Sequence, residues 1–349
     1  MNHQEILEWL KEKDRRNLRE LWRQADASRR LHVGDEVHLR GLTEISNHCV
    51  RQCGYCGLRA GNSYIERYRM NKTEIMECAG ECVRREYGTI VLQAGEDYGI
   101  KTPALSNLIQ RIKAETPLAV TLSMGERPLA DLSEWRNAGA DRYLLRFETS
   151  DRHLYELIHP AYKGRKSDRI VTLRVLKSLG YEIGGGVMVG IPGQTYESLA
   201  RDIEIFRELD LDMIGIGPYL PHPQTPLGRG EWKRNISEAE QAPNDEETTL
   251  KMFALSRIAC PEANIPATTA LATLNPQSGI EAGLMRGANV LMPDLTPQRF
   301  RNNYQIYPDR QAIHDSHDLS LRRRLENIDR RPGVGPGGRF DRLSEIIAL

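Results

Sequence analysis

The sequence predicts an α/β fold, a (β/α)8 barrel of the TIM type with an N-terminal helical cap. Three observations support this prediction: eight short apolar runs typical of strands, helical patterns between them, and a length of 349 residues that one barrel can occupy. A doubly wound open sheet is the alternative architecture. In either fold the chemistry gathers at the carboxyl ends of the strands.

Each element follows from its local pattern, beginning at the N-terminus. Residues 1–36 hold two amphipathic stretches, with Leu7 and Leu10 in the first and Leu18 and Leu21 in the second, and are expected to form an N-terminal helical extension. The strands are short apolar runs, such as AVTLS, and are expected at 37–45, 89–93, 119–123, 142–146, 182–189, 213–216, 265–268 and 289–292. The helices between them are expected at 72–86, 103–115, 129–137, 168–179, 197–208, 246–258 and 279–285.

The barrel is expected to span residues 37–310, followed by a C-terminal extension of helix and loop over residues 311–349. The polar segment 224–245 breaks the alternation and is expected to be an exposed insertion. The run PGVGPGG at 332–338 is expected to be a flexible turn, because it has an internal proline and opens no apolar helix, unlike a phosphate-binding loop.

Charge and hydropathy exclude some classes of function. The 48 basic residues equal the 48 acidic residues in number, so no net field attracts nucleic acid or a membrane surface. The N-terminal stretch is polar, and no apolar run is long enough to cross a bilayer. We therefore expect a cytoplasmic protein with neither nucleic acid nor membrane as partner.

Three of the six cysteines, Cys49, Cys53 and Cys56, form a C-x3-C-x2-C pattern directly after the first predicted strand. Thiolates are the usual ligands of iron–sulfur clusters. Three thiolates in one loop can hold three irons of a [4Fe-4S] cubane and leave the fourth iron open to a ligand. The pattern therefore indicates a reactive cluster at the catalytic end of the barrel.

Two alternatives to this interpretation are a zinc site and a purely structural role for all three cysteines. A zinc site would recruit His48 or a remote residue as fourth ligand, although zinc sites usually pair cysteines as C-x2-C twice. The remaining cysteines, Cys78 and Cys82 on one face of a helix and Cys260 near a helix end, are expected to be small buried apolar groups. We therefore expect one cluster only.

Charged residues alternate along the fourth predicted strand. Arg142, Arg146 and Glu148 share one face with Leu144. Charges on that face are unfavourable in dry core but suit a chamber that binds a ligand. A mutual ion pair is the alternative interpretation.

Several segments together resemble one known family. They are RQCGYCGLR, TIVLQAGED, VTLSMGERP, GADRYLLRFET, LGYEIGGGVMVGIPGQT, DMIGIGPYLPHPQTPL, NIPATTALAT, RGANVLMP and NNYQIYP. Because these segments occur together and in this order, the sequence is similar to the radical S-adenosylmethionine (SAM) superfamily. Within it, the sequence resembles the biotin synthase-like branch, and within that branch the HydE-type maturases of [FeFe]-hydrogenase. The resemblance covers residues 38 to 310, which is nearly the whole predicted barrel.

The resemblance implies two cofactors, a [4Fe-4S] cluster on the three cysteines and SAM on its open iron. One electron would cleave SAM to a 5′-deoxyadenosyl radical. The implied SAM-binding residues are Tyr55, Gly95, Glu96, Glu148, Arg169 and Gly190. Where relatives often have Gly-Gly-Glu, this sequence has Ala94 before Gly95 and Glu96, which puts only the local backbone geometry in doubt.

The resemblance also implies which residues face the substrate. The implied substrate-binding residues are Thr121, Arg142, Arg146, Met213, Thr268, Thr269 and Ala270. The implied catalytic residues are Met292, Tyr304 and Tyr307. Arginines and hydroxyls suit an amino-acid carboxylate, and methionines and tyrosines suit an apolar or soft group.

Three functions remain open. The first is [FeFe]-hydrogenase maturation, in which the radical acts on a cysteine-bound iron carbonyl/cyanide precursor. The second is a related small-molecule enzyme, such as a methylornithine synthase. The third is a binding module without catalysis, stabilised by zinc or a cluster. For the first, the resemblance implies a small-molecule or organometallic substrate, an external electron donor of ferredoxin or flavodoxin type, and other hydrogenase maturases as partners.

Overall fold

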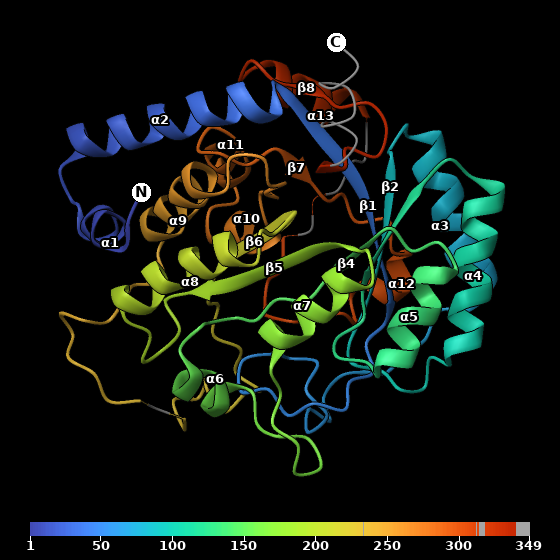
Figure 1. Ribbon diagram of the computed structural model, residues 1–349. Helices are drawn as coiled ribbons and strands as arrows, with labels where there is room; N and C mark the ends of the chain where they lie inside the picture. The colour runs from blue at the N-terminus through green and yellow to red at the C-terminus, as the bar shows by residue number, and fades with distance from the viewer. Residues whose placement is uncertain (233, 312, 314–317, 340–349) are drawn as a thin grey trace.

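The computed structural model describes residues 1–232, 234–311, 313 and 318–339 of the chain (Figure 1). The strands are β1 (Glu36–Ser46), β2 (Thr89–Ala94), β3 (Ala119–Ser123), β4 (Arg142–Leu144), β5 (Glu182–Val189), β6 (Met213–Pro218), β7 (Val290–Leu291) and β8 (Arg331–Pro332). The helices are α1 (His3–Lys11), α2 (Arg15–Val33), α3 (Lys72–Arg84), α4 (Thr102–Glu115), α5 (Leu129–Asn137), α6 (Arg152–Ile158), α7 (Arg169–Ser178), α8 (Tyr196–Glu208), α9 (Glu246–Ala259), α10 (Thr269–Leu274), α11 (Gly279–Leu284), α12 (Gln298–Arg301) and α13 (Asp318–Glu326).

The sheet is parallel and curled. Its strand order is β6-β5-β4-β3-β2-β1-β7, so the strands from β1 to β6 lie side by side in chain order. Helices follow these strands and cover the outside of the sheet (Figure 1). This arrangement is a TIM-like partial barrel and confirms the predicted fold class.

The gap between β6 and β7 is bridged rather than filled by a full strand. The segment 264–267 forms two isolated parallel bridges, one from Asn264 to Met213 and one from Pro266 to Val290. The expected strand at 265–268 is therefore reduced to bridges, because the chain turns into α10 directly after Thr268. Likewise β4 ends at Leu144 rather than at residue 146.

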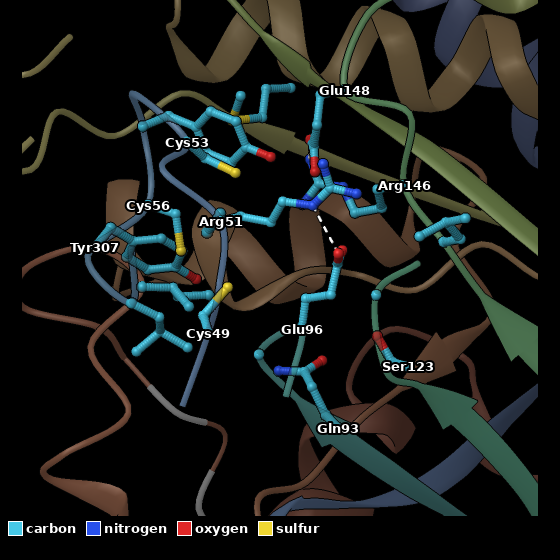
Figure 2. A pocket seen from close by; sticks show the side chains of 18 of the residues that line it. Cys49, Arg51, Cys53, Cys56, Gln93, Glu96, Ser123, Arg146, Glu148 and Tyr307 are labelled. Atoms are coloured by element: carbon cyan, nitrogen blue, oxygen red, sulfur yellow. Dashed lines mark hydrogen bonds and ion pairs between the residues drawn. The ribbon is translucent and has the colours of Figure 1, made fainter. Parts of the chain in front are cut away.

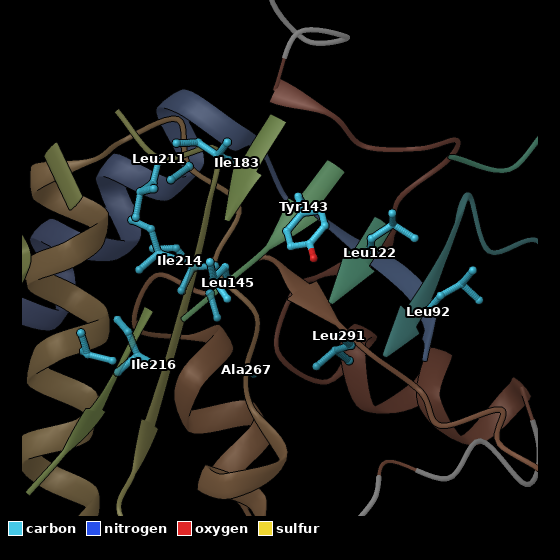
Figure 3. Packing of buried hydrophobic residues seen from close by; sticks show 14 of the residues in the cluster. Leu92, Leu122, Tyr143, Leu145, Ile183, Leu211, Ile214, Ile216, Ala267 and Leu291 are labelled. Atoms are coloured by element: carbon cyan, nitrogen blue, oxygen red, sulfur yellow. The ribbon is translucent and has the colours of Figure 1, made fainter. Parts of the chain in front are cut away.

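The two faces of the strands divide stability from function. Alternate side chains point outward and pack under the helices, among them Leu92, Leu122, Ile183 and Ile214 (Figure 3). Each such aliphatic side chain contributes about 1.5–3 kcal/mol when fully buried. The residues between them face the barrel axis, and many are polar or lack a side chain: Glu44, Gln93, Ser123, Arg146 and Gly184. The outer layer therefore holds the fold, and the interior is chemically suited to a polar ligand.

The N-terminal helices rest on the outside of the barrel. Helix α1 packs against α8, and α2 packs against α9 (Figure 1). His3 pairs with Glu197 at 2.6 Å across the first contact. The division into parts at 1–36, 37–310 and 311–349 stays a prediction, and residues 312, 314–317 and 340–349 of the last part lie outside the described residues.

The glycine-rich tail covers the amino end of the barrel instead of projecting as a free turn. Strand β8 pairs with the start of β1. The carbonyl of Gly337 accepts hydrogen bonds from the guanidinium of Arg40 at 3.2 Å and from the side chain of Asn264 at 3.0 Å. A Cβ at Gly88 would overlap the carbonyl of Gly335, so the start of β2 and the tail approach closely only because residue 88 is glycine.

Candidate functional site

A cavity lies at the carboxyl ends of the strands. Its wall includes Gln93 of β2, Ser123 at the end of β3, Leu144 of β4 and Met188 of β5. The loop after β1 contributes three thiols, those of Cys49, Cys53 and Cys56 (Figure 2). The cavity therefore brings the predicted cluster ligands to the place where barrel enzymes carry their chemistry.

The cysteine loop is fixed by backbone contacts to three other parts of the chain. The amide of Val50 donates to the carbonyl of Glu96 at 3.0 Å, Gly54 to Ile158 at 2.7 Å, and Gly57 to Ile306 at 2.9 Å. At Gly95 a Cβ would overlap the carbonyl of His48 and lie 2.8 Å from the Cβ of Cys49. The loop thus follows one path, set by contacts from the rest of the barrel.

The segment 224–245 covers the outer side of this loop. The amide of Leu227 donates to the carbonyl of Gly54 at 3.0 Å, and a Cβ at Gly54 would overlap the ring of Trp232. Residues 225–227 are buried. The expectation of an exposed insertion is therefore wrong for this first part, because its apolar residues pack on the cysteine loop.

The three thiols lie in a site that disfavours their free anions. Burial raises the pKa of Cys56 to about 12 and the pKa of Cys49 above its ordinary range. Burial raises the pKa of Cys53 further still, and the neighbouring thiol of Cys49 adds to the shift. Because iron binds the thiolate, loading of a cluster has to compensate this desolvation.

A network of charges faces the thiols across the cavity. Glu96 accepts from the Nε of Arg51 at 2.7 Å, as the dashed line in Figure 2 marks. Arg51 also pairs with Glu126 at 3.1 Å, and Arg169 donates to the same carboxylate at 3.2 Å. Burial raises the pKa of Glu96, and the cation of Arg51 opposes that shift. Both signs of charge therefore line one wall, as a zwitterionic amino-acid group requires.

Arg169, Arg146 and Glu148 form the other side of this network. Arg169 begins α7, donates to the carbonyl of Arg146 at 2.7 Å, and donates to the Nε2 of His159 at 2.9 Å. Arg146 pairs with Glu148 at 3.1 Å. Glu148 has a φ of 66°, a conformation that turns the chain sharply after β4 and that few non-glycine residues adopt.

Two buried polar atoms of the cavity make no hydrogen bond within the described part of the chain. They are Nη1 of Arg51 and Nε of Arg146, whereas Oε2 of Glu148 is held by the ion pair with Arg146. Buried polar atoms are nearly always satisfied, so such a group of exceptions is typical of a site that awaits a polar ligand. The residues present therefore fit a ligand with carboxylate, ammonium and hydroxyl groups beside a thiolate-bound cluster.

A site for a single metal ion differs from a site for an iron–sulfur cluster, because all its ligands bind the same ion. Among the described residues, no three histidine, cysteine, aspartate or glutamate side chains are grouped so as to hold one metal ion.

Two tyrosines close the cavity from the C-terminal segment of the barrel. Tyr304 is 3% exposed, and burial raises its pKa well above the ordinary value. The hydroxyl of Tyr307 lies 2.7 Å from that of Thr269, and burial raises its pKa as well. Both phenols are therefore neutral hydrogen-bonding groups in the folded protein. The next arginine, Arg310, anchors this segment through a buried ion pair of 2.6 Å with Glu44.

Most of the sequence-predicted site residues line this one cavity. They are Cys49, Cys53, Tyr55, Cys56, Gly95, Glu96, Arg146, Glu148, Arg169, Ala270, Tyr304 and Tyr307. Thr269 reaches it through the hydroxyl of Tyr307.

Other predicted residues lie elsewhere and make contacts different from those expected. Arg142 faces the barrel axis near its amino end, where it pairs with Glu182 of β5 and donates to Thr89 at 3.0 Å. The mutual ion pair considered as the alternative is made by Arg146 and Glu148 instead. Met213 lies at the same depth and accepts from Arg40 at 3.0 Å. Strand alternation predicts the face of a residue but not its depth along the axis.

Four further residues also fall outside the cavity wall. Gly190 packs against the backbone of Asn244, which a Cβ at that glycine would overlap. Thr268 precedes α10 and donates to the carbonyl of Ile216 at 2.8 Å rather than closing a strand. Thr121 is buried on β3 and Met292 follows β7, and neither contributes to the wall.

Sequence reasoning missed some residues of the wall. Arg51 lies inside the cysteine loop, and its position between two ligands was the available signal. Glu126, which pairs with both Arg51 and Arg169, lies in the quoted segment VTLSMGERP but carries no local signal of its own.

Comparisons with known proteins agree with this geometry. The chain matches the family described as the radical SAM superfamily over residues 43–216. It is 44% identical over 322 residues to the [FeFe] hydrogenase maturase subunit HydE of Thermotoga maritima. The aligned residues cover 91% of this chain and 88% of that protein. It is 30% identical over 320 residues to 3-methylornithine synthase of Methanosarcina acetivorans, with 90% and 85% covered. The crystal structure of a methylornithine synthase has the same fold, with a TM-score of 0.78 at 24% identity over 98% of this chain and 96% of that one.

Proposed function

This chain belongs to the radical SAM superfamily, and on that premise we propose that it is an [FeFe]-hydrogenase maturase of the HydE type. As a radical SAM enzyme it uses a [4Fe-4S] cluster and SAM. We propose a cysteine-bound iron carbonyl/cyanide unit as the substrate. The identity of 44% to a HydE subunit over most of both chains supports the specific activity.

The proposal assigns roles to the residues of the cavity. Cys49, Cys53 and Cys56 would hold the cluster. Glu96 and Arg169 would hold the ammonium and carboxylate of SAM, and Glu148 its ribose hydroxyls. Tyr55 and Gly95 complete this side of the wall. When bound, the reduced cluster supplies the electron that cleaves SAM to methionine and a 5′-deoxyadenosyl radical.

The protein's own groups orient the reactants and keep water out. Arg146, with one buried Nε–H unpaired within the described chain, offers a donor for an anionic substrate. Tyr304 and Tyr307 cover the cavity with neutral phenols, and Thr269 holds the hydroxyl of Tyr307. A wall of this kind protects a reactive species from solvent.

One observation carries the proposal: three thiols, both signs of charge and two unpartnered guanidinium nitrogens meet in a single cavity. The first test is anaerobic reconstitution followed by dithionite and SAM, with 5′-deoxyadenosine measured. We expect its formation by the wild type and its absence in Cys53→Ala. A reconstituted wild type that forms none would contradict a radical SAM activity.

The second test concerns hydrogenase maturation. An [FeFe]-hydrogenase is expressed with every maturase except the HydE subunit, and this chain is then added. We expect hydrogen evolution with the wild type and none with Cys53→Ala. Cleavage of SAM without any gain in hydrogenase activity would overturn the maturase assignment and leave the radical chemistry intact.

A related small-molecule activity is the second candidate, favoured by the 30% identity to 3-methylornithine synthase. It predicts an amino-acid substrate and formation of 3-methylornithine, which mass spectrometry detects.

The proposed partners follow from the proposed function. They are an external one-electron donor of ferredoxin or flavodoxin type and the other hydrogenase maturases. Within the described residues, none of the helices has the length and apolarity to cross a membrane. We propose a cytoplasmic location, where these partners and low-potential electrons are found.

A further inference from the structure

A second cleft lies beside Arg51 of the cysteine loop and is strongly basic. Five cations contribute to it, with Glu126 as its one carboxylate: Arg51, Arg127, Lys163, Arg165 and Lys166. Glu126 is already paired with Arg51 at 3.1 Å and with Arg169 at 3.2 Å. The cleft therefore presents an excess of positive charge on a chain whose overall charge is balanced.

Three of the five basic side chains, those of Lys163, Arg165 and Lys166, lie on or directly after a hairpin. Tyr162 and Arg165 exchange both backbone hydrogen bonds, at 3.1 and 3.0 Å. Lys163 and Gly164 between them have φ of 50° and 76°, as a type I′ turn requires. Figure 1 shows this hairpin projecting between α6 and α7, at the same end of the molecule as the loop after β1. The cations are thus displayed in a preorganised way.

The partners of these cations are few. Lys166 is 68% exposed and pairs with Glu156 at 2.8 Å. Arg127 is paired with Asp131 at 2.8 Å. Lys163 lies over the ring of Tyr162, 5.4 Å from its centroid, and neither Lys163 nor Arg165 has a carboxylate partner within the described chain. Two exposed cations are therefore available to an acidic surface.

Arg51 connects this cleft to the cluster site. Its side chain lines both cavities, it stands between Cys49 and Cys53 in the chain, and its guanidinium lies 5.5 Å from the centroid of the Tyr162 ring. One side chain therefore separates the basic surface from the cavity that holds the thiols. A protein bound on the hairpin would have its contact face next to the cysteine loop.

We propose that this basic cleft is the docking surface for an acidic one-electron carrier protein that reduces the cluster. The inference rests on the proposed function, because only a cluster that receives electrons needs such a partner. The donor loses one electron, the cluster gains it, and no bond or proton is exchanged. Complementary charge raises the association rate and orients the partner, and salt weakens the effect.

Charge reversal on the hairpin tests the proposal. The probe is an acidic bacterial flavodoxin, and its binding to the cluster-loaded enzyme is followed through flavin fluorescence at low and high salt. We expect the double variant Arg165→Glu and Lys166→Glu to raise the Kd about tenfold or more at low salt and to flatten the salt dependence. The turn residues Lys163 and Gly164 are kept so that the hairpin retains its shape.

A matched control carries the same change of net charge far from the cleft. The control is the double variant Lys13→Glu and Arg19→Glu. Lys13 lies just before α2 and Arg19 lies in α2, and both are exposed. Figure 1 shows α2 far from α6 and α7, between which the hairpin lies. We expect the control to bind flavodoxin within about twofold of wild type. Equal weakening in both double variants would overturn the docking surface, because it would report net charge alone.

The two electron sources separate this inference from the proposed function. With dithionite, which needs no docking, the hairpin variant is expected to form 5′-deoxyadenosine at the wild-type rate. With reduced flavodoxin its rate is expected to fall in step with the Kd. Wild type that is inactive with dithionite contradicts the proposed function instead. If the hairpin variant loses binding of inorganic phosphate but keeps binding of flavodoxin, the inference is overturned and the cleft is a small-anion site.

Discussion

The cysteines fall into two groups that differ in their surroundings, one in the cavity and one in the core. Cys49, Cys53 and Cys56 line the cavity with the charged wall opposite. Cys78 and Cys82 are buried on α3, and the thiol of Cys78 donates to the carbonyl of Leu295 at 3.4 Å. The second pair behaves as small apolar side chains in the packing under β1.

This difference gives a prediction about iron. Cys56→Ala is expected to lower the iron content from about four per chain to a small fraction of that, because two thiolates cannot hold the cubane. Cys78→Ala is the control and is expected to keep the iron, with a modest loss of stability. Iron analysis after anaerobic reconstitution checks both. Wild-type iron well above about four per chain would contradict a single cluster.

A buried histidine predicts how stability depends on pH. Burial, followed by the cations of Arg169 and Arg51, lowers the pKa of His159 from 6.5 to about 2. In the unfolded chain the same ring protonates below pH 6.5, so the unfolded state gains protons first as pH falls. The contribution of His159 is fully present above pH 6.5 and is lost as pH falls toward 2, by about 2 kcal/mol between pH 7 and pH 5.

His159→Gln tests this sign. A glutamine oxygen can still accept from Arg169 but does not titrate. The urea unfolding free energy of the cluster-free protein is measured at pH 7 and pH 5, and the variant is expected to lose about 2 kcal/mol less than wild type over that interval. An identical loss in both proteins would show that His159 is not the group responsible.

Some site residues could be predicted from the local sequence, and others could not. The cysteine ligands are predictable because three thiols within one short loop after a strand are typical of cluster binding and of little else. Arg142 and Met213 were expected to bind the substrate but do not line the cavity. Strand alternation specifies the face on which a residue lies, and its depth along the barrel axis follows from contacts such as those with Glu182 and Arg40. Glu126 has its role only through partners from distant parts of the chain.

Among helices and strands, three elements were predicted with their observed bounds. The bounds expected for β3, β5 and α5 coincide with those observed. The helices α6, α10 and α12 were not predicted, because each is only one or two turns long and depends on tertiary contacts. Segment 224–245 is mostly polar in sequence, yet Leu227 and Trp232 within it contact the cysteine loop at Gly54.

The junction of β2 with the cysteine loop predicts an effect of backbone spacing. In Gly95→Ala the new Cβ would lie 2.8 Å from the Cβ of Cys49 and overlap the carbonyl of His48, so the loop must move. We expect a destabilisation of about 1–3 kcal/mol and a several-fold loss of bound iron, measured by thermal unfolding and iron analysis.

Gly80→Ala provides the comparison for that variant. Gly80 lies inside α3, where a Cβ would be 3.4 Å from the flexible end of Arg84. This change is expected to stabilise the protein by about 0.5–1 kcal/mol and to leave the iron content unchanged. Equal iron loss in the two variants would contradict a special role for the spacing at Gly95.

For the molecule as a whole, the six strands between residues 36 and 218 follow from the sequence, while closure of the barrel does not. The strand expected at 265–268 is reduced to bridges, and β8 was not expected. The amino end is covered by residues 331–339, and the bridge from β6 to β7 is made by residues 264–267. Both contacts join segments far apart in the chain, and neither leaves a local pattern of apolar residues.

Closure of the amino end can be separated from the chemistry at the carboxyl end. In Gly88→Ala the Cβ would overlap the carbonyl of Gly335 and displace the tail. We expect a lower melting temperature, corresponding to about 1–3 kcal/mol, and faster proteolysis near residue 335, with cluster loading preserved. Iron lost in parallel with stability would show that the two ends are not independent.

The shielding of the cluster site also sets an order of events in the cell. The side chain of Asn47 donates to the carbonyl of Asn303, 256 positions later, and the neighbouring tyrosines complete the wall. During synthesis the three thiols leave the ribosome long before the segment that encloses them exists. Iron delivered to a nascent chain meets three uncovered thiols, whereas iron delivered to the finished protein meets Cys49 and Cys56 half-buried and Cys53 buried.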